Sequence, residues 1–131
     1  MKPELQIVEI AKYLGFKPEV YDCELGGLSE IWFVDPNNPY ASLSQSADAP
    51  SYIDKDGRRV RMGNLPDYCN DLNAMHVAEK VLKDKRLLFR YHLALAELAQ
   101  FQGNNHLNTF HATASQRAEA FLKTVELWKE E

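Results

Sequence analysis

Cysteine and basic charge are both scarce in this sequence of 131 residues, and each scarcity argues against a class of protein. The two cysteines, Cys23 and Cys69, lie far apart and form no Cys-x-x-Cys pair. A small secreted chain commonly carries a disulfide framework, so we interpret both as free thiols. The net charge is −4, from 15 basic and 19 acidic residues, whereas a general nucleic-acid binder has a basic excess. General nucleic-acid binding is therefore disfavoured, and only a local basic patch stays open.

Long apolar runs and known cofactor motifs are also missing. No segment reaches the roughly 20 apolar residues that a membrane-spanning helix needs. The first residues show no secretory pattern, because Gln6, Glu9 and Lys12 interrupt their apolar positions. The chain has neither a phosphate loop nor a Gly-x-Gly-x-x-Gly fingerprint, and its histidines and cysteines match no zinc spacing. We expect a cytoplasmic protein that holds no metal and no cofactor and binds no membrane.

The apolar content is sufficient for one packed domain. Apolar residues make up 45% of the sequence and aromatic residues 11%, which is enough to fill one core. A length of 131 residues is also typical of one domain. We expect a single domain over 1–131, of the α+β class, in which a small antiparallel sheet is flanked by helices.

Two helices have clear boundaries in the sequence. Residues 3–14 place apolar side chains at helical spacing, and Gly15 is suited to end that helix. Residues 70–83 contain the clearest apolar stripe, and either Asn70 or Asp71 can cap its first turn.

Two further segments are predicted to be helical, although their boundaries are less clear in the sequence. The first residues of segment 86–101 would suit a strand, but its alanine- and leucine-rich remainder favours a helix, which we prefer. A last helix over 114–128 begins at Thr113 or Ser115. We expect this helix to pack against the sheet through Phe121, Leu122 and Val125.

The strands are expected mainly in the first half of the chain. Residues 19–23 and 30–34 read as a hairpin with turn glycines between them. Residues 35–57 are rich in proline and small polar residues and are interpreted as a long loop. A tight turn then leads to a third strand over 58–62, and 107–111 is a further short strand candidate.

Catalysis has one candidate group, which we do not favour. Cys69 comes just before a helix N-terminus, where the helix dipole lowers a thiol pKa, and His76 or His111 would serve as its base. The commoner alternative is a half-buried, inert cysteine beside a cap. Asp71 likewise has two candidate roles, which are steering a ligand and capping the helix. We therefore expect a protein that is not an enzyme.

Two stretches of the sequence are more specific than these patterns. One is Pro66–His76 with Ala78–Lys80, which includes a Pro-x-Tyr-x-x-Asp pattern, and the other is His111–Thr124, which ends near Trp128. Together with Leu14-Gly15-Phe16, they resemble a family of small bacteriophage proteins described as the phage ABA sandwich domain. The likeness covers 35–63 and 84–110 poorly. It implies a three-layer helix–sheet–helix domain and an accessory protein in the host cytoplasm, and it transfers no catalytic role.

A phage accessory protein of this kind can antagonise host defence by sequestering a nucleotide-derived immune signal. Such a site needs backbone amides at a helix start, arginines for phosphates and aromatic rings for bases. Trp32, Tyr40 and Tyr52 are the aromatic candidates. The candidate ligand-binding residues are an arginine cluster and the entrance of the middle helix, namely Arg58, Arg59, Arg61, Tyr68, Asn70, Asp71 and Asn73.

Each of these features also has a plain alternative. Polar residues at helix starts are usually caps, a tryptophan in a strand is usually in the core, and arginines in a turn usually face solvent. The rival function is a module that binds a host or phage protein. The oligomeric state is left open by the sequence.

Overall fold

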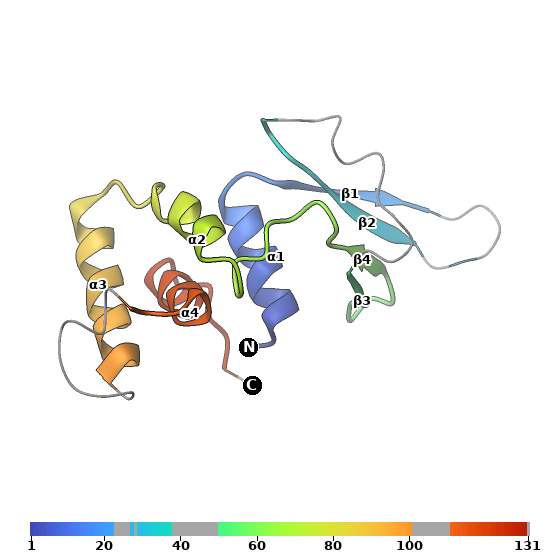
Figure 1. Cartoon of the computed structure of the whole chain (residues 1–131). Coiled ribbons are helices and arrows are strands. Elements are labelled where there is room, and N and C mark those ends of the chain that lie inside the picture. Colours follow the sequence, from blue (N-terminus) through green and yellow to red (C-terminus); the bar gives the residue numbers. More distant parts are fainter. Residues whose placement is uncertain (23–26, 28, 38–49, 101–110, 131) are drawn as a thin grey trace. The chain divides into compact units, whose positions relative to one another are not determined.

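The structure is a computed structural model that describes residues 1–22, 27, 29–37, 50–100 and 111–130. The described residues form four helices and a four-stranded sheet, which confirms the α+β class (Figure 1). Cys23, Tyr40 and most of the strand expected over 107–111 lie outside the described residues.

The chain divides into two compact units. Unit 1 consists of residues 1–10 and 66–131, and unit 2 consists of residues 11–65. The boundary falls inside the first helix, after Ile10. The expectations of one domain over 1–131 and of three layers stay predictions.

Unit 2 contains the sheet, whose strands are ordered β1-β2-β4-β3. β1 (Lys17–Tyr21) and β2 (Glu30–Val34) pair antiparallel as expected, although β1 begins and ends two residues before the predicted 19–23. β4 (Arg59–Arg61) pairs parallel with β2. The sheet is therefore mixed, and the expectation of a wholly antiparallel sheet was wrong. The reason is that the β3–β4 hairpin joins β2 through its second strand.

The hairpin that ends at β4 depends on one aspartate and one glycine. β3 (Ser51–Ile53) pairs antiparallel with β4, inside the segment that was predicted to be loop. The Asp54 carboxylate accepts hydrogen bonds from the backbone N–H groups of Asp56 and Arg58 at 2.9 and 2.8 Å. Gly57 has a φ of 79°, a left-handed conformation that glycine adopts without strain. The tight turn predicted here is thus present, and the strand before it was missed.

The first helix, α1 (Pro3–Tyr13), agrees with the predicted 3–14. Gly15 ends it with a φ of 103°. In that conformation the backbone N–H groups of Gly15 and Phe16 reach back to the carbonyls of Lys12 and Ala11. This is the stop that the sequence predicted.

The next two helices of unit 1 are separated by a short, tight connection. α2 (Leu72–Glu79) is shorter than the predicted 70–83, because the backbone amides of residues 80–82 bond to carbonyls three residues back. Asp84 then accepts a hydrogen bond from the Arg86 backbone N–H and opens α3 (Lys85–Gln100). The preference for helix over strand in 86–101 is confirmed over its described part.

The last helix, α4 (Ala114–Thr124), begins with a complete capping box and ends earlier than predicted. The Thr113 side chain accepts a hydrogen bond from the Gln116 backbone N–H, and the Gln116 side chain accepts one from the Thr113 backbone N–H. Glu126 adopts a φ of 63°, and the Leu127 N–H bonds to the Leu122 carbonyl at 2.8 Å. This left-handed residue closes the helix, so the expected extension to 128 was wrong.

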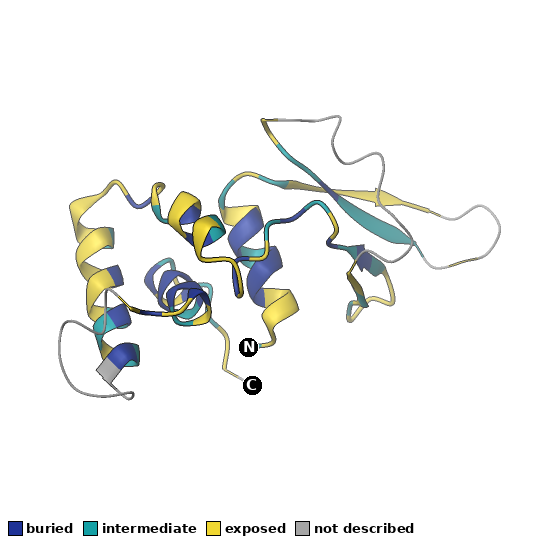
Figure 2. Cartoon of the chain, viewed as in Figure 1, coloured by how far each residue is buried: buried dark blue, intermediate teal, exposed yellow. Residues whose placement is uncertain are grey.

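The core of unit 1 lies among its helices. Phe121 and Leu122 are fully buried, whereas Val125 is only partly buried (Figure 2). Within unit 1 the helix that carries them packs against α3 and α2. The expected packing of this helix against the sheet, which belongs to unit 2, stays a prediction.

Candidate functional site

One face of the sheet in unit 2 gathers aromatic and charged side chains. Residues opposite each other in a ladder share a face, and alternate residues along a strand share it too. Tyr21 is opposite Glu30, and Glu30 is opposite Arg59. We call this the polar sheet face, and define it by Tyr21, Glu30, Trp32, Arg59 and Arg61.

The opposite face of the same sheet is apolar and includes the core of unit 2. Phe33 and Val60 point there and are almost completely buried, at 2% and 3% exposed. Burial of this apolar face holds the strands in register, because a slip by one residue would turn Phe33 towards solvent. The core therefore fixes which side chains lie on the polar sheet face.

Glu30 organises the polar sheet face by binding two of its members. One carboxylate oxygen accepts a hydrogen bond from Arg61 Nη2 at 2.8 Å, and the other accepts one from Trp32 Nε1 at 2.9 Å. The bond from Arg61 holds the pKa of Glu30 below its usual value, although partial burial opposes this. Glu30 therefore stays ionised at neutral pH and keeps both partners in position.

The aromatic rings of this face are placed beside an arginine. The Arg61 guanidinium carbon lies 6.0 Å from the centroid of the Trp32 ring, within cation–π range. Tyr21 meets Trp32 edge-on, with ring centroids 6.4 Å apart and planes at 84°. Trp32 is partly exposed and Tyr21 is exposed. The face thus presents π surface next to two arginines and two carboxylates, since Glu19 lies opposite Trp32 and accepts a hydrogen bond from the Tyr21 hydroxyl at 2.6 Å.

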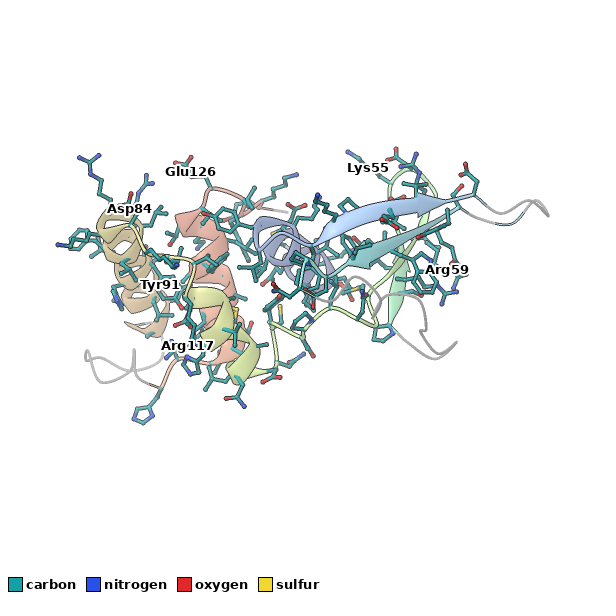
Figure 3. The ribbon with its side chains drawn as sticks, turned by 90° about the horizontal axis from the view of Figure 1, so that it is seen from above. Lys55, Arg59, Asp84, Tyr91, Arg117 and Glu126 are labelled. Carbon is teal, nitrogen blue, oxygen red and sulfur yellow. The ribbon has the colours of Figure 1, made fainter. Side chains whose placement is uncertain are left out.

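The three arginines predicted as a cluster do not act as one group. Arg59 and Arg61 alternate along β4, so both lie on the polar sheet face, and Figure 3 labels Arg59 beside the strands. Arg61 Nε is buried and has no hydrogen-bond partner among the described residues. Arg58 precedes the strand, is exposed, and belongs to the turn. The structure therefore brings together two of the three arginines.

The residues predicted at the helix entrance lie in unit 1, whereas the arginines lie in unit 2. Tyr68 is only 2% exposed, and the Asn70 side-chain amide donates to the Asp67 carboxylate at 3.0 Å. Asp71 caps α2 by accepting from the backbone N–H groups of Asn73 and Ala74. Capping, the commoner alternative for Asp71, is confirmed. A ligand-binding role for these residues stays a prediction.

Cys69 is a buried thiol of unit 1. Its S–H lies within donating distance of Gln6 Oε1, at 3.5 Å. Burial, reinforced by the charges of Asp67 and Glu4, raises the pKa of this thiol to about 11. The expectation that a helix dipole lowers the pKa was wrong, because desolvation outweighs it. Among the described residues, no three histidine, cysteine or acidic side chains are grouped so that they could hold a metal ion.

Comparison with models of protein families, with curated proteins and with solved structures finds no match. The resemblance to the phage ABA sandwich domain therefore stays a prediction. No helix in the described part of the chain combines the length and the apolar character needed to cross a bilayer.

A buried polar cluster in unit 1 was missed by the sequence reasoning. Arg117 of α4 lies 3.1 Å from the Glu79 carboxylate of α2, and its Nε donates to the Ala112 carbonyl at 3.2 Å. Burial and the nearby Glu79 raise the pKa of Tyr91 on α3 (Figure 3). The available clue was position, since Arg117 stands four residues before the core residue Phe121 on the apolar stripe of α4.

A second missed feature is an apolar surface on α3. Phe89 is 65% exposed and Leu93 is 56% exposed, and helical spacing places both on the side of α3 away from the buried Tyr91 and Leu95. Figure 2 shows exposed and buried stretches along this helix. The sequence showed two apolar stripes on this segment, of which only one can face the core of unit 1.

Proposed function

We propose that this chain is a non-catalytic phage accessory protein that sequesters a nucleotide-derived immune signal on the polar sheet face. The observation that supports this function best is that Trp32 and Tyr21 share one face with Arg59 and Arg61. A nucleotide offers a flat base and negative phosphates. The same face offers rings for stacking and guanidinium groups for charge-assisted hydrogen bonds.

The roles of the side chains follow from their contacts. Trp32 is held by Glu30 through its ring N–H and is only partly buried, so the part of its ring that Arg61 and Tyr21 do not contact is the surface proposed for a base. Arg59 is the arginine whose charge is less engaged, because Arg61 forms the direct ion pair with Glu30 at 2.8 Å. We therefore assign Trp32 to the base and Arg59 to a phosphate.

The first experiment is a thermal-shift and calorimetric screen against cyclic dinucleotides, cyclic trinucleotides and cyclic ADP-ribose isomers. A ligand that binds the folded chain alone raises the melting temperature in a concentration-dependent way. We expect one of these classes to do so. If none of them shifts the melting temperature at high excess, the ligand proposal is refuted.

Variants locate the site. Trp32→Ala should weaken binding by about 1–3 kcal/mol, roughly 5- to 150-fold, because a stacked base is lost. Arg59→Ala should cost about 1.5–3 kcal/mol, as for a hydrogen bond to a charged group. Arg58→Ala is the matched control, since it removes the same charge one residue away and outside the face. Equal losses of binding free energy in Arg58→Ala and Arg59→Ala would indicate non-specific electrostatic attraction rather than a defined binding site.

The same experiment tests whether the protein is an enzyme. After incubation with the chain, the ligand should be recovered unchanged by chromatography and mass spectrometry. Cys69→Ser and His76→Ala should bind like the wild type. Turnover that either substitution abolishes, in a chain that still folds, would contradict the non-catalytic proposal.

The rival function, binding of a host or phage protein, is favoured by a different observation. Phe89 and Leu93 expose large apolar side chains, and such residues commonly serve as anchors at interfaces. Capture of one stoichiometric protein from infected cells, lost in a Phe89→Asp variant, would support this rival.

A further inference from the structure

Three apolar residues of α3 are spaced as in a helix pair, and of these Phe89 and Leu93 are exposed and Ala96 is partly buried. Phe89, Leu93 and Ala96 follow one another at intervals of four and three, which is the interval of a coiled-coil seam. We call these three residues the outer face of α3. They lie opposite Tyr91 and Leu95, each 2% exposed, which face the interior of unit 1. The helix therefore has one face that packs internally and a second apolar face on which Phe89 and Leu93 are exposed.

The charges beside this outer face are divided along the helix. Lys85, Arg86 and Arg90 lie in its first half, and Glu97 lies in its second half. Arg90 and Glu97 are seven residues apart, so they lie on the same flank of the helix, two turns from each other. Arg90 also lies 3.6 Å from Glu126, which follows the end of α4, but both side chains are exposed, at 57% and 76%. Such an exposed pair leaves Arg90 available to another carboxylate.

We propose that the outer face of α3 is covered by the α3 of a second copy of this chain, packed antiparallel about a two-fold axis at Leu93. With a rise of 1.5 Å per residue, Phe89 lies about 6 Å before Leu93 and Ala96 about 4.5 Å after it. In the antiparallel pair, Phe89 of one copy therefore meets Ala96 of the other. The large Phe89 side chain fills the space beside the small Ala96 side chain, and the two-fold axis repeats this contact on both sides of Leu93.

Charge complementarity selects the antiparallel arrangement. Residues on one flank of α3 face the same flank of an antiparallel copy, so Arg90 of each copy lies within about 1.5 Å, along the axis, of Glu97 of the other. The two copies thus form two symmetric ion pairs. A parallel pair would instead place Phe89 against Phe89 and would carry the Arg90–Glu97 flanks of the two copies to opposite sides of the interface, so neither ion pair would form. A second copy therefore supplies both the shape and the charges that this surface needs.

The size of the contact sets the expected strength. α3 has 16 residues and is about 24 Å long, so one helix pair gives an interface at the small end of specific contacts. We expect a dimer that forms and dissociates with concentration. This inference does not depend on the ligand proposal, because the polar sheet face belongs to unit 2 and α3 to unit 1.

Sedimentation equilibrium over a wide concentration range tests the inference. The wild-type chain should approach twice its mass of 15.0 kDa as the concentration rises. Leu93→Asp should raise the dimer dissociation constant at least about tenfold, as expected for an anchor at the centre of an interface. Val77→Asp is the matched control, since Val77 is 63% exposed, against 56% for Leu93, and lies on another helix of unit 1. That control should dimerise like the wild type.

A charge-exchange experiment identifies the partner and its orientation. Arg90→Glu and Glu97→Arg should each weaken self-association, because each places like charges opposite one another. An equimolar mixture of the two single variants should restore the dimer, since all four flank charges are then complementary. The double variant should also dimerise. Circular dichroism spectra like that of the wild type would show that these exposed substitutions leave the fold intact.

The proposal is overturned if the wild-type chain stays at 15.0 kDa at every concentration. It is also overturned by a dimer that Leu93→Asp and Val77→Asp affect equally, or by a mixture of the single charge variants that does not associate. A host protein captured through Leu93, with no self-association, would also refute the dimer and favour the rival function.

Discussion

The Arg117 guanidinium lies 3.1 Å from the Glu79 carboxylate and joins the last helix of the chain to α2. The Arg117 side chain is only 11% exposed and that of Glu79 is 20% exposed. A charge pair so shielded from water depends on both partners, because removal of one leaves the other charge poorly solvated.

Arg117→Met should lower the free energy of unfolding by about 3 kcal/mol, the lower part of the range for breaking a buried pair. Urea denaturation measures this loss. The double variant Arg117→Met, Glu79→Leu should recover much of the stability, because it removes both charges and leaves apolar groups of similar size.

The control for this pair is Lys123→Met. Lys123 lies 3.1 Å from Glu119, as close as Arg117 is to Glu79, but the pair is more exposed. Loss of this exposed ion pair should lower the free energy of unfolding by under about 1 kcal/mol. Equal losses at Lys123 and Arg117 would mean that burial does not determine the contribution of the buried pair.

Phe121→Ala should lower the free energy of unfolding by about 3–5 kcal/mol, because Phe121 is completely buried and the smaller side chain leaves a cavity. Phe89→Ala removes the same atoms from a side chain that is 65% exposed, so it should change the stability of the monomer by no more than about 0.5 kcal/mol. Denaturation at low protein concentration compares the two. A loss below about 1 kcal/mol for Phe121 would contradict the packing of α4.

The raised pKa of Cys69 predicts a pH dependence of stability. The folded chain holds this thiol proton up to a pKa of about 11, whereas the unfolded thiol has its ordinary pKa near 9. Between these values the unfolded state binds fewer protons, so stability falls as the pH rises from about 9 to 11.

Two measurements check this expectation. In a Cys23→Ser background, Cys69 should react slowly with a thiol reagent at pH 8 in the native state and rapidly in urea. The fall in stability above pH 9 should become smaller in a Cys69→Ala variant. Rapid labelling of the native chain would indicate an accessible thiolate and would support the catalytic alternative.

Local chemistry explains why most helices were predicted well. Gly15 and Thr113 act through the backbone of their own segments, so their effects are visible in the sequence. The early end of α4 was missed because a glutamate, Glu126, adopts the left-handed conformation that glycine usually marks. The strand β3 was missed because three residues are too few to show a clear alternation.

The candidate site shows the same difference between features visible in the local sequence and features set by contacts between distant segments. The sequence identified Arg59, Arg61 and Trp32 as groups able to contact a nucleotide, but it had no means to place them on one face. That placement depends on β4 pairing parallel with β2, a contact between segments about 30 residues apart. The sequence also grouped Arg58 with them, because it treated three neighbouring arginines as one cluster.

The sequence by itself determined the α+β class, the end of α1 at Gly15, the turn before β4 and the presence of the chemical groups. These depend on interactions within a few residues of the chain. Only the tertiary structure decided the mixed sheet, the raised pKa of Cys69, the pairing of Arg117 with Glu79 and the exposure of Phe89. Each of these depends on which distant segments exclude water from a side chain, and burial of that kind is a property of the packed chain rather than of its local sequence.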